Sequence, residues 1–349
     1  MNLPTSNTPI QLHKVAIVGA GAIGGWLGAG LAGAGCDLSL LARGATLQAL
    51  QQKGLRLRRK VPQNGGQPLE SEAQFTVKSS DNAADLGPQD LVVIAVKGPA
   101  LAQVAAQIAP LLRPGTLVLV AMNGVPFWFL QGFGGALAGR QLQSVDPGGH
   151  IAAAFSEPGT GAVVVGGVVH ASCSVTAPGI IQHHFGNGMI VGEPSGQPTP
   201  RVQALTTLLT RAGFEATLSP QIQKDVWFKL WGNMTVNPIS ALTGATTDLI
   251  LADPLVRNFV SAVMLEAKEI GARLGISIDQ QPEDRHQVTL KLGAFKTSML
   301  QDVEAGRAVE LDALVSVVRE LGELTQTPTP FTDALLGLSR LQARKLGLY

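Results

Sequence analysis

The first fifty residues follow an order of apolar and glycine-rich segments that is typical of a nucleotide-binding unit. Val15–Val18 is a short apolar run rich in β-branched residues, and the glycine turn Gly19–Gly24 follows it directly. A segment of small residues to about Gly33 then predicts a helix, and Asp37–Ala42 predicts a second strand. This order of strand, turn, helix and strand predicts the opening βαβ unit of a dinucleotide-binding domain.

Two later apolar runs, Leu91–Val96 and Thr116–Met122, have the length and continuity of buried parallel strands. Lys97 follows the first run, and Asn123 follows the second. In open α/β sheets ligands bind beyond the carboxyl ends of the strands, so we expect Lys97 and Asn123 at the edge of a cofactor site. The alternatives are a solvated loop lysine and a simple Asn-Gly turn.

From Val125 to about Gly161 the chain is rich in glycine, proline and aromatic residues, and its pattern predicts no regular element. Exposed aromatic side chains there would suit a lid or an interface loop. The pattern beyond it predicts short strands at Val163–Val169, Gly179–His184 and Met189–Gly192 with a hairpin turn at Gly186–Gly188, then a helix at Arg201–Arg211 and a strand at Glu215–Leu218.

After Pro220 the pattern changes to long helices without strand periodicity. The predicted helices are Gln221–Asn237, one that starts at Asp253-Pro254 and ends near Leu274, Lys291–Ala305 and Val309–Thr325. We therefore expect an α/β fold class, with an N-terminal Rossmann-type dinucleotide-binding domain and a C-terminal all-helical domain. The expected boundaries are 1–12 for a flexible leader, 13–220 for the dinucleotide-binding domain and 221–349 for the helical domain.

The first helix of this second domain carries a polar stripe on an otherwise apolar segment. Lys229, Asn233 and Asn237 stand four residues apart, so they share one helix face, and Pro238 is expected to end the helix. Asparagine and glycine are poor residues for a helix interior, each costing about 0.5–1 kcal/mol relative to alanine. An ion pair of Lys229 with Asp225 is the structural alternative, but the helix cost of the asparagines favours a functional stripe.

The amino-acid composition of the chain argues against several classes of function. The chain has 349 residues, 45% hydrophobic, and a net charge of +1, so nothing in its balance indicates nucleic acid or an anionic membrane surface. Its two cysteines, far apart and outside any CxxC motif, fit a reducing cytosol and indicate no metal site. Two uncharged stretches, Val15–Cys36 and Gly115–Gly139, are long enough to span a bilayer, but eight glycines in the first and an Asn-Gly-x-Pro turn in the second argue against it.

Each glycine of the G-x-G-x-x-G motif meets a physical demand. Gly19 permits the tight turn, Gly21 lets the backbone approach a pyrophosphate, and Gly24 lets the helix pack closely on the strand. The phosphates would then lie at the helix N-terminus. An incidental glycine-rich turn is the alternative, and the flanking strand and helix favour a binding site. The predicted cofactor-binding turn comprises Gly19, Ala20, Gly21, Ala22, Ile23 and Gly24.

The end of the second predicted strand indicates which dinucleotide is bound. An NAD site places an acidic residue about 20 residues beyond the glycine turn, whereas an NADP site supplies arginine. Here the strand ends in Leu41-Ala42-Arg43, and its acidic residue, Asp37, stands at its start. We therefore expect NADP(H), with Arg43 under the 2′-phosphate; a solvated arginine is the alternative.

Taken together, these motifs closely resemble the ketopantoate reductase (2-dehydropantoate 2-reductase) family, from about His13 to about Leu348. The glycine turn is shared with many dehydrogenases, but the polar helix stripe and a downstream block are specific to this family. The residues that carry the resemblance are the glycine turn, Lys97, Asn123-Gly124, Lys229-x3-Asn233-x3-Asn237-Pro238, Thr297–Asp302 and Glu310-Leu311-Asp312.

The resemblance implies an NADPH-dependent reduction of 2-dehydropantoate to pantoate, in pantothenate and coenzyme A biosynthesis. It implies that Lys229 is the general acid and that Glu310 hydrogen-bonds the reacting centre and orients the lysine. The implied substrate-binding residues are Asn123, Asn233, Asn237 and Ser298, with Ser298 on the carboxylate side, and the implied cofactor contacts outside the glycine turn are Arg43, Lys97 and Asn123.

The resemblance also implies a small-molecule 2-oxo acid substrate, a cytoplasmic monomer or homodimer, no metal, and neither nucleic acid nor membrane as a partner. Two departures bear on the substrate: the span from Asn123 to His170 is longer than compact family members need, and Thr247 stands at a family asparagine position. A reductase of another small 2-oxo acid and a non-catalytic NADP(H)-sensing protein are the alternatives.

Overall fold

A computed structural model describes residues 10–63, 66–156 and 160–349, so most of the expected leader lies outside the described residues. By its internal contacts the chain divides into two units. The first comprises the described residues up to Val96, Gln103–Ala121 and those of Ala154–Pro220; the second comprises Lys97–Ala102, Met122–Ala153 and Gln221–Tyr349. The second unit is therefore assembled from three separate segments of the chain.

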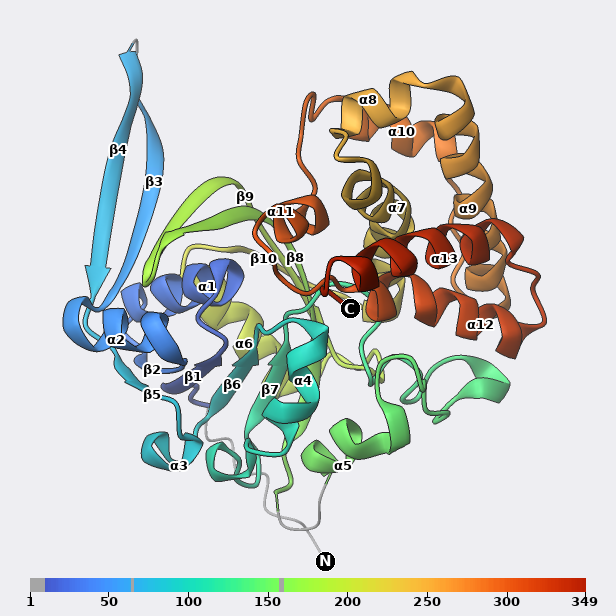
Figure 1. Ribbon diagram of the computed structural model, residues 1–349. Helices are drawn as coiled ribbons and strands as arrows, with labels where there is room; N and C mark the ends of the chain where they lie inside the picture. The colour runs from blue at the N-terminus through green and yellow to red at the C-terminus, as the bar shows by residue number, and fades with distance from the viewer. Residues whose placement is uncertain (1–9, 64–65, 157–159) are drawn as a thin grey trace, which may run out of the picture. The chain divides into compact units, whose positions relative to one another are not determined.

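A single mixed sheet forms the first unit, and its ten strands in the described part of the chain are labelled in Figure 1. Along the sheet the strands lie in the order β4-β3-β9-β8-β7-β6-β1-β2-β5, and β10 pairs with β9. The β3–β4 and β8–β9 pairs are antiparallel and the others are parallel. The strands are β1 (Lys14–Val18), β2 (Asp37–Leu41), β3 (Leu55–Gln63), β4 (Gly66–Phe75), β5 (Lys78–Ser80), β6 (Leu91–Ile94), β7 (Leu117–Val120), β8 (Val163–Ala177), β9 (Ile180–Gly192) and β10 (Glu215–Leu218).

Strands β1, β6 and β7 are parallel neighbours at the centre of the sheet, as their unbroken apolar runs predict. Helix α1 (Ala22–Gly33) packs on β1 and on its neighbours β2, β3, β8 and β9 through its small residues. A Cβ at Gly24 would lie 1.9 Å from the Gly19 carbonyl oxygen and 3.0 Å from the Ile17 side chain. Gly24 therefore permits the close helix–strand packing expected of the third glycine of the motif.

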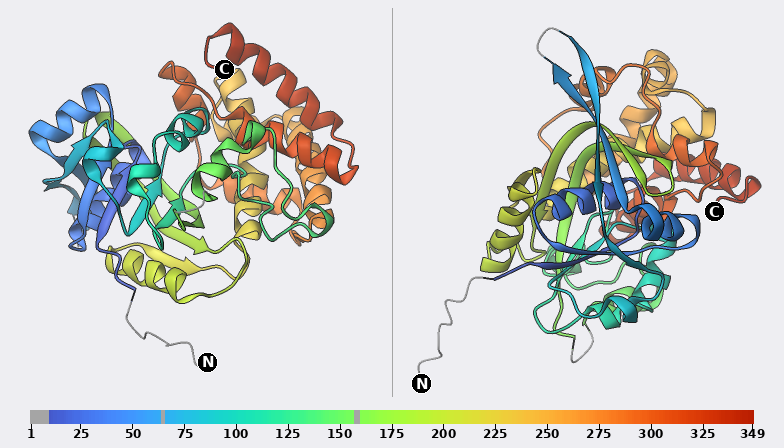
Figure 2. Two further views of the ribbon diagram at one scale, coloured as in Figure 1. Left: turned by 90° about the horizontal axis from the view of Figure 1, so that it is seen from below. Right: turned by 90° about the vertical axis from the view of Figure 1, so that its left-hand side faces the viewer.

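The remaining helices of the first unit are short. The β3–β4 hairpin extends beyond the other strands in Figure 1 and in the right-hand view of Figure 2. Helix α2 packs against β5, the edge strand next to β2. These helices are α2 (Gly44–Lys53), α3 (Ala83–Leu86) and α6 (Pro200–Arg211), and α4 (Gly98–Ala105) begins in the second unit and ends in the first.

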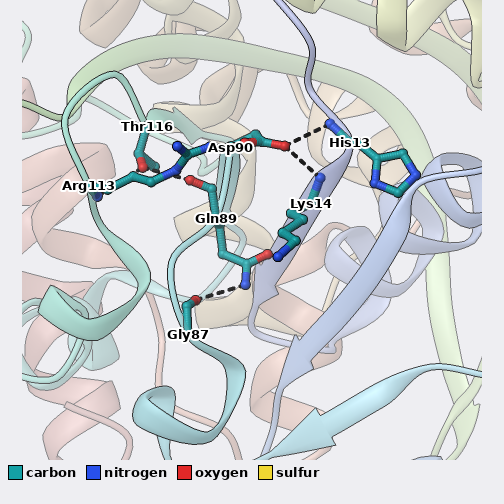
Figure 3. A network of polar contacts seen from close by, with 7 residues as sticks. All are labelled: His13, Lys14, Gly87, Gln89, Asp90, Arg113 and Thr116. Carbon is teal, nitrogen blue, oxygen red and sulfur yellow. Dashed lines mark hydrogen bonds and ion pairs between the residues drawn. The ribbon is translucent and has the colours of Figure 1, made fainter.

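The carboxylate of Asp90, directly before β6, binds the backbone at the start of β1 (Figure 3). Asp90 accepts hydrogen bonds from the backbone N–H groups of His13 (3.0 Å) and Lys14 (2.8 Å), and it pairs with the Arg113 guanidinium. Burial acts to raise the pKa of Asp90, but the two N–H donors and the arginine outweigh it and hold that pKa below its usual value. This network lies at the sheet end opposite the glycine turn and fixes the starts of β1 and β6.

The predicted hairpin turn at Gly186–Gly188 is wrong. Strand β8 runs to Ala177, β9 starts at Ile180, and the turn between them contains Gly179. Within β9 the register shifts, because His170 pairs with Gly188 while Ser172 pairs with Phe185. Gly186, with a φ of +76°, lies at this bulge, so the glycines that suggested a turn serve an irregularity inside one long strand.

Helices make up the second unit, and no strand occurs in its described residues, which confirms the all-helical prediction. No helix in the part of the chain that the structure describes has the length and apolarity to cross a membrane. The helices are α5 (His150–Ser156, shared with the first unit), α7 (Ile222–Thr243), α8 (Thr247–Ala252), α9 (Pro254–Arg273), α10 (Pro282–Leu290), α11 (Ser298–Glu304), α12 (Val317–Thr325) and α13 (Pro330–Lys345), with one π-helical stretch at Asp312–Ser316.

Several predicted helix limits are wrong. The segment Lys291–Ala305 is not one helix: α10 ends at Leu290, and α11 begins at Ser298 because the Thr297 hydroxyl caps it by accepting from the Leu300 N–H (3.2 Å). Helix α7 also continues through Pro238 to Thr243 instead of ending there. Tertiary packing of this buried helix outweighs the local penalty of an internal proline.

The second unit has a core of tryptophans on α7. The indole N–H groups of Trp227 and Trp231 donate to the carbonyls of Ala267 (3.2 Å) and Met264 (2.7 Å) on α9. Phe129, from the segment without predicted structure, packs against Trp227 with ring centroids 5.9 Å apart. The aromatic side chains Phe127, Trp128 and Phe129 are all buried, so the expectation of exposed aromatic side chains in this segment is wrong.

Candidate active site

The glycine turn of the first unit opens onto a cavity at the carboxyl end of β1. Gly19 has a left-handed φ of +101°, and its N–H donates to the Leu41 carbonyl at the end of β2 (3.2 Å). A Cβ at Gly21, the N-cap of α1, would meet no atom within 4 Å. This open backbone at a helix N-terminus fits a pyrophosphate. The cavity has a volume of about 250 Å³, and its lining includes Gly19, Ala20, Gly21, Ala42, Arg43, Thr46, Asp81 and Gln103.

Arg43 lies at the predicted position on this cavity. It is the N-cap residue of α2, and its Nη1 donates to Oε1 of Gln103 (2.8 Å). Asp81, which follows the edge strand β5, also lines the cavity and was missed in the sequence. A three-residue strand has no periodicity from which its neighbour could be placed, so the pattern gave no signal for Asp81. Ala22 and Ile23, the other members of the predicted turn, begin α1.

Lys229 lies on the central helix of the second unit and is held by an amide from a distant part of the chain. Its Nζ donates to Oδ1 of Asn123 (2.9 Å), 106 residues away in sequence. Burial lowers the pKa of Lys229 to about 8; the negative charge of Glu310 acts against this shift, and the positive charge of Arg285 adds to it. The ammonium group is therefore a stronger acid than an ordinary lysine.

Glu310 belongs to the same set of groups. Its Oε1 accepts a hydrogen bond from the backbone N–H of Gly98 (3.3 Å), which comes from the Lys97–Ala102 segment. Burial raises the pKa of Glu310, and the charges of Lys97 and Lys229 together with the Gly98 N–H act against the rise. The carboxylate and the two lysines are thus electrostatically coupled within one unit.

Lys97 forms an ion pair with Asp302 of α11. The Asp302 side chain is only 8% exposed, and it also accepts from Nε of Arg307 (3.1 Å). Asp302 was part of the motif block recognised in the sequence but received no role there. Its buried carboxylate anchors Lys97 to the second unit, a contact that the position of Lys97 after a predicted strand did not indicate.

The predicted substrate-binding residues of the helical segment lie on two packed helices, α7 and α11. Asn237 is buried with 5% exposure, and Asn233, one turn earlier, is partly buried. Ser298 is exposed and is the first residue of α11, directly after the capping residue Thr297. These residues share the second unit with Lys229.

The position of Asn123 is fixed by the residues that follow it. Gly124 has a φ of +81°, and a Cβ there would lie 2.3 Å from the Ala313 carbonyl oxygen. The next N–H, of Val125, donates to the same carbonyl (2.8 Å). The Asn-Gly pair thus docks on the π-helical stretch that follows Glu310, and this contact sets Asn123 beside Lys229.

Comparison with known families identifies the chain. The family model for ketopantoate reductase PanE/ApbA matches residues 15–127, and the model for the C-terminal part of the same family matches residues 221–343. The chain belongs to the ketopantoate reductase family. This membership confirms the resemblance and the expected fold class.

Relatives in this family match nearly the full chain. A 2-dehydropantoate 2-reductase from Mesorhizobium japonicum is 45% identical over 337 residues, which cover 96% of this chain and 99% of that protein. A crystal structure from Ralstonia solanacearum MolK2 is 53% identical, with a TM-score of 0.89, and covers 97% of this chain and 100% of that one. The 2-dehydropantoate 2-reductase of Methylococcus capsulatus is similar at 25% identity and a TM-score of 0.77, covering 95% of this chain and 97% of that one.

This ketopantoate reductase family member thus gathers its predicted residues in two places. The glycine turn and Arg43 line the cavity of the first unit, whereas Lys97, Asn123, Lys229 and Glu310 meet inside the second. Arg285 of α10 also acts on Lys229 and was missed. It stands in a short polar helix, where an arginine is ordinarily a solvated residue, so the sequence gave no signal for it.

Proposed function

We propose that the protein reduces 2-dehydropantoate to pantoate with NADPH and that Lys229 supplies the proton. The proposal rests above all on one observation: a lysine with a pKa lowered to about 8, held by Asn123 and coupled to Glu310, on the helix that carries the family's polar stripe. A sensor that binds the nucleotide without chemistry has no use for such a group. Residues 13–220 are proposed as the NADP-binding domain and residues 221–349 as the substrate and catalytic domain. Lys97 and Asn123 stand in the first of these ranges in the sequence but belong to the second unit of the structure.

The chemistry follows from the charge that develops on the substrate. Bound NADPH supplies a hydride to C2 of the 2-oxo acid. As the C2–H bond forms, the carbonyl π electrons move to oxygen, and the Lys229 ammonium donates a proton to that oxygen, so the product is a 2-hydroxy acid. The Asn123 amide oxygen accepts a hydrogen bond from Nζ and fixes the position of the ammonium group.

Glu310 has the role of a partner to the lysine. The negative charge of Glu310 favours the protonated form of Lys229. Burial raises the pKa of Glu310 itself, so the protonation states of the two groups depend on each other. Asn233, Asn237 and Ser298 are proposed to hold the substrate, with Ser298 toward its carboxylate side. Lys97 stays a predicted contact at the nicotinamide end.

The direct experiment follows NADPH absorbance at 340 nm with purified protein and a panel of 2-oxo acids that includes 2-dehydropantoate. We expect 2-dehydropantoate to have the highest kcat/KM of the panel. A higher kcat/KM for another 2-oxo acid would reassign the substrate within the same reaction class. No turnover of any member would refute the reductase proposal and favour a protein that only binds NADP(H).

The pH dependence of the two reaction directions should be opposite. Reduction requires protonated Lys229, so kcat/KM for 2-dehydropantoate should be constant below the pKa of about 8 and fall about tenfold per pH unit above it. Oxidation of pantoate requires the neutral amine and should rise through the same range. Rates measured from pH 6 to 10 in constant ionic strength test this, and a flat profile for reduction up to pH 10 would contradict a lysine acid with a lowered pKa.

Arg43 should determine the preference for NADPH over NADH. The change Arg43→Gln removes a charge-assisted contact with the 2′-phosphate, so KM for NADPH should rise by about ten- to hundredfold while KM for NADH changes little. Lys53→Gln, at the other end of α2, is the matched control and should leave both values unchanged. Equal effects on the two cofactors would show that Arg43 does not contact the 2′-phosphate.

A further inference from the structure

A guanidinium group without a carboxylate partner lies beside the helix that carries Lys229. Arg285 of α10 is partly buried, and its Nε is buried and has no hydrogen-bond partner among the described residues. Leaving such a donor unpaired is unfavourable, so a buried arginine is normally paired. Other arginines of this unit do pair with carboxylates, namely Arg257, Arg273, Arg307 and Arg319.

Helix α7 leaves space for this guanidinium group at Gly232. A Cβ at Gly232 would lie 2.7 Å from Nε of Arg285, so glycine leaves the space that the arginine occupies. The guanidinium also stacks over the Phe228 ring, 5.4 Å from its centroid. Glycine is disfavoured in a helix interior, and Gly232 is one of the residues that made this helix unusual in the sequence. The close approach of Arg285 accounts for it.

Phe228 and Gly232 place Arg285 on the part of α7 that bears Lys229. Gly232 stands three residues after Lys229, so the two positions are neighbours on the helix surface. The positive charge of Arg285 helps to lower the pKa of Lys229. Two neighbouring cations in a partly buried site repel each other, and an anion between them relieves that repulsion.

We propose that Arg285 binds the carboxylate of the substrate while Lys229 faces the adjacent C2 carbonyl. This inference rests on the proposed reductase function and deepens it. In a 2-oxo acid the carboxylate is bonded directly to the carbonyl carbon, so neighbouring cations on one helix face match its two oxygen-bearing groups. The free Nε–H and the Nη groups form a planar fork that suits two carboxylate oxygens. The site thereby selects 2-oxo acids as free carboxylates over their esters, amides and lactones.

The test compares Arg285→Gln and Arg285→Lys with the parent protein on 2-dehydropantoate and on its lactone, which has the ketone but no carboxylate. We expect KM for the acid to rise about ten- to hundredfold in Arg285→Gln, with KM for NADPH unchanged and the low activity on the lactone unaffected. Arg285→Lys should recover only part of the loss, because it keeps the charge but not the fork. Added guanidinium ion should partly restore the glutamine variant.

Arg257→Gln is the matched control, because Arg257 of α9 already has a carboxylate partner, Glu283 of α10; it should leave both KM values unchanged. Thermal melting of each variant monitors folding. An unchanged KM for the acid in Arg285→Gln, or an equal loss with acid and lactone, would overturn the carboxylate assignment.

A binding measurement separates this inference from the proposed reaction. Oxamate, which resembles a 2-oxo acid but is not reduced, is titrated calorimetrically into the protein in the presence of NADP⁺. Loss of oxamate binding in Arg285→Gln supports the anion site even if the parent protein turns over none of the tested 2-oxo acids. Equal binding by the parent protein and the variant overturns the site even if turnover is observed.

Discussion

Replacing Lys229 with alanine should lower kcat for 2-dehydropantoate by about 10²–10⁴-fold and leave the affinity for NADPH nearly unchanged. The reason is that the ammonium acts on charge that forms only as the hydride arrives, so its loss affects the transition state more than the bound substrate. The affected step is measured directly by single-turnover oxidation of NADPH in a stopped-flow instrument. Cofactor affinity is measured separately from NADPH fluorescence.

Lys224→Ala provides the control for this change. Lys224 is exposed on the same helix α7, so it tests whether removing a lysine from this helix is harmful in itself. The control should keep the parental kcat. A Lys229→Ala protein that retains more than a tenth of the parental kcat would remove Lys229 from the role of general acid, whatever its effect on KM.

The change Gly24→Ala should destabilise the first unit by about 3 kcal/mol and abolish NADPH binding. A methyl group at this position would lie 1.9 Å from the Gly19 carbonyl oxygen, which is a backbone atom and cannot rotate away, so α1 has to move away from β1. That movement also displaces the helix N-terminus from the glycine turn. Thermal denaturation with and without NADP⁺ should show a lower Tm and no shift on adding the cofactor.

Two other glycines of the same turn and helix separate the folding effect from the binding effect. Gly33→Ala should be neutral or slightly stabilising, because its methyl group would come no closer than 3.8 Å to any neighbour. Gly21→Ala should keep the parental Tm, since nothing lies within 4 Å, but should weaken NADPH binding where the pyrophosphate approaches the backbone. If Gly24→Ala behaves like Gly33→Ala, the close packing of α1 on β1 does not control the cofactor site.

The elements that the sequence predicted well are those with strong local patterns. The strands at Val15–Val18, Leu91–Val96 and Thr116–Met122 are buried on both faces, and their continuous apolar runs distinguish them from their surroundings. The glycine turn is equally local, because its residues meet their structural demands within six positions. Family membership and the two-part fold class are confirmed, since they depend on these motifs and on the change to helical periodicity after Pro220.

The predictions that failed depended on contacts that no local pattern contains. Gly186 and Gly188 look like a turn in isolation, but pairing with β8 turns them into a bulge. Phe127 and Trp128 look like an exposed loop, but the second unit buries them. In each case the deciding partner lies elsewhere in the chain.

The members of the candidate site could be predicted, but not their partners. Lys229 and Glu310 stood out as charged residues in recognisable motifs. The amide that holds Lys229 lies 106 residues away, and the N–H that Glu310 accepts lies 212 residues away, so neither pairing leaves a trace in sequence spacing. Arg285 was missed for the same reason. Only the contact of its side chain with Gly232 distinguishes it from a solvated arginine.

The assembly of the second unit from three chain segments has a consequence for engineering. A chimera made at a single crossover near residue 220 would combine Lys229 and Glu310 from one parent with Lys97, Gly98 and Asn123 from the other. Such hybrids should inherit mismatched partners even when both halves fold. Exchanging Lys97–Ala102, Met122–Ala153 and Gln221–Tyr349 as one block would keep the Lys229–Asn123 and Glu310–Gly98 hydrogen bonds native, so the first unit, with its cavity at Arg43, could be replaced without altering these contacts.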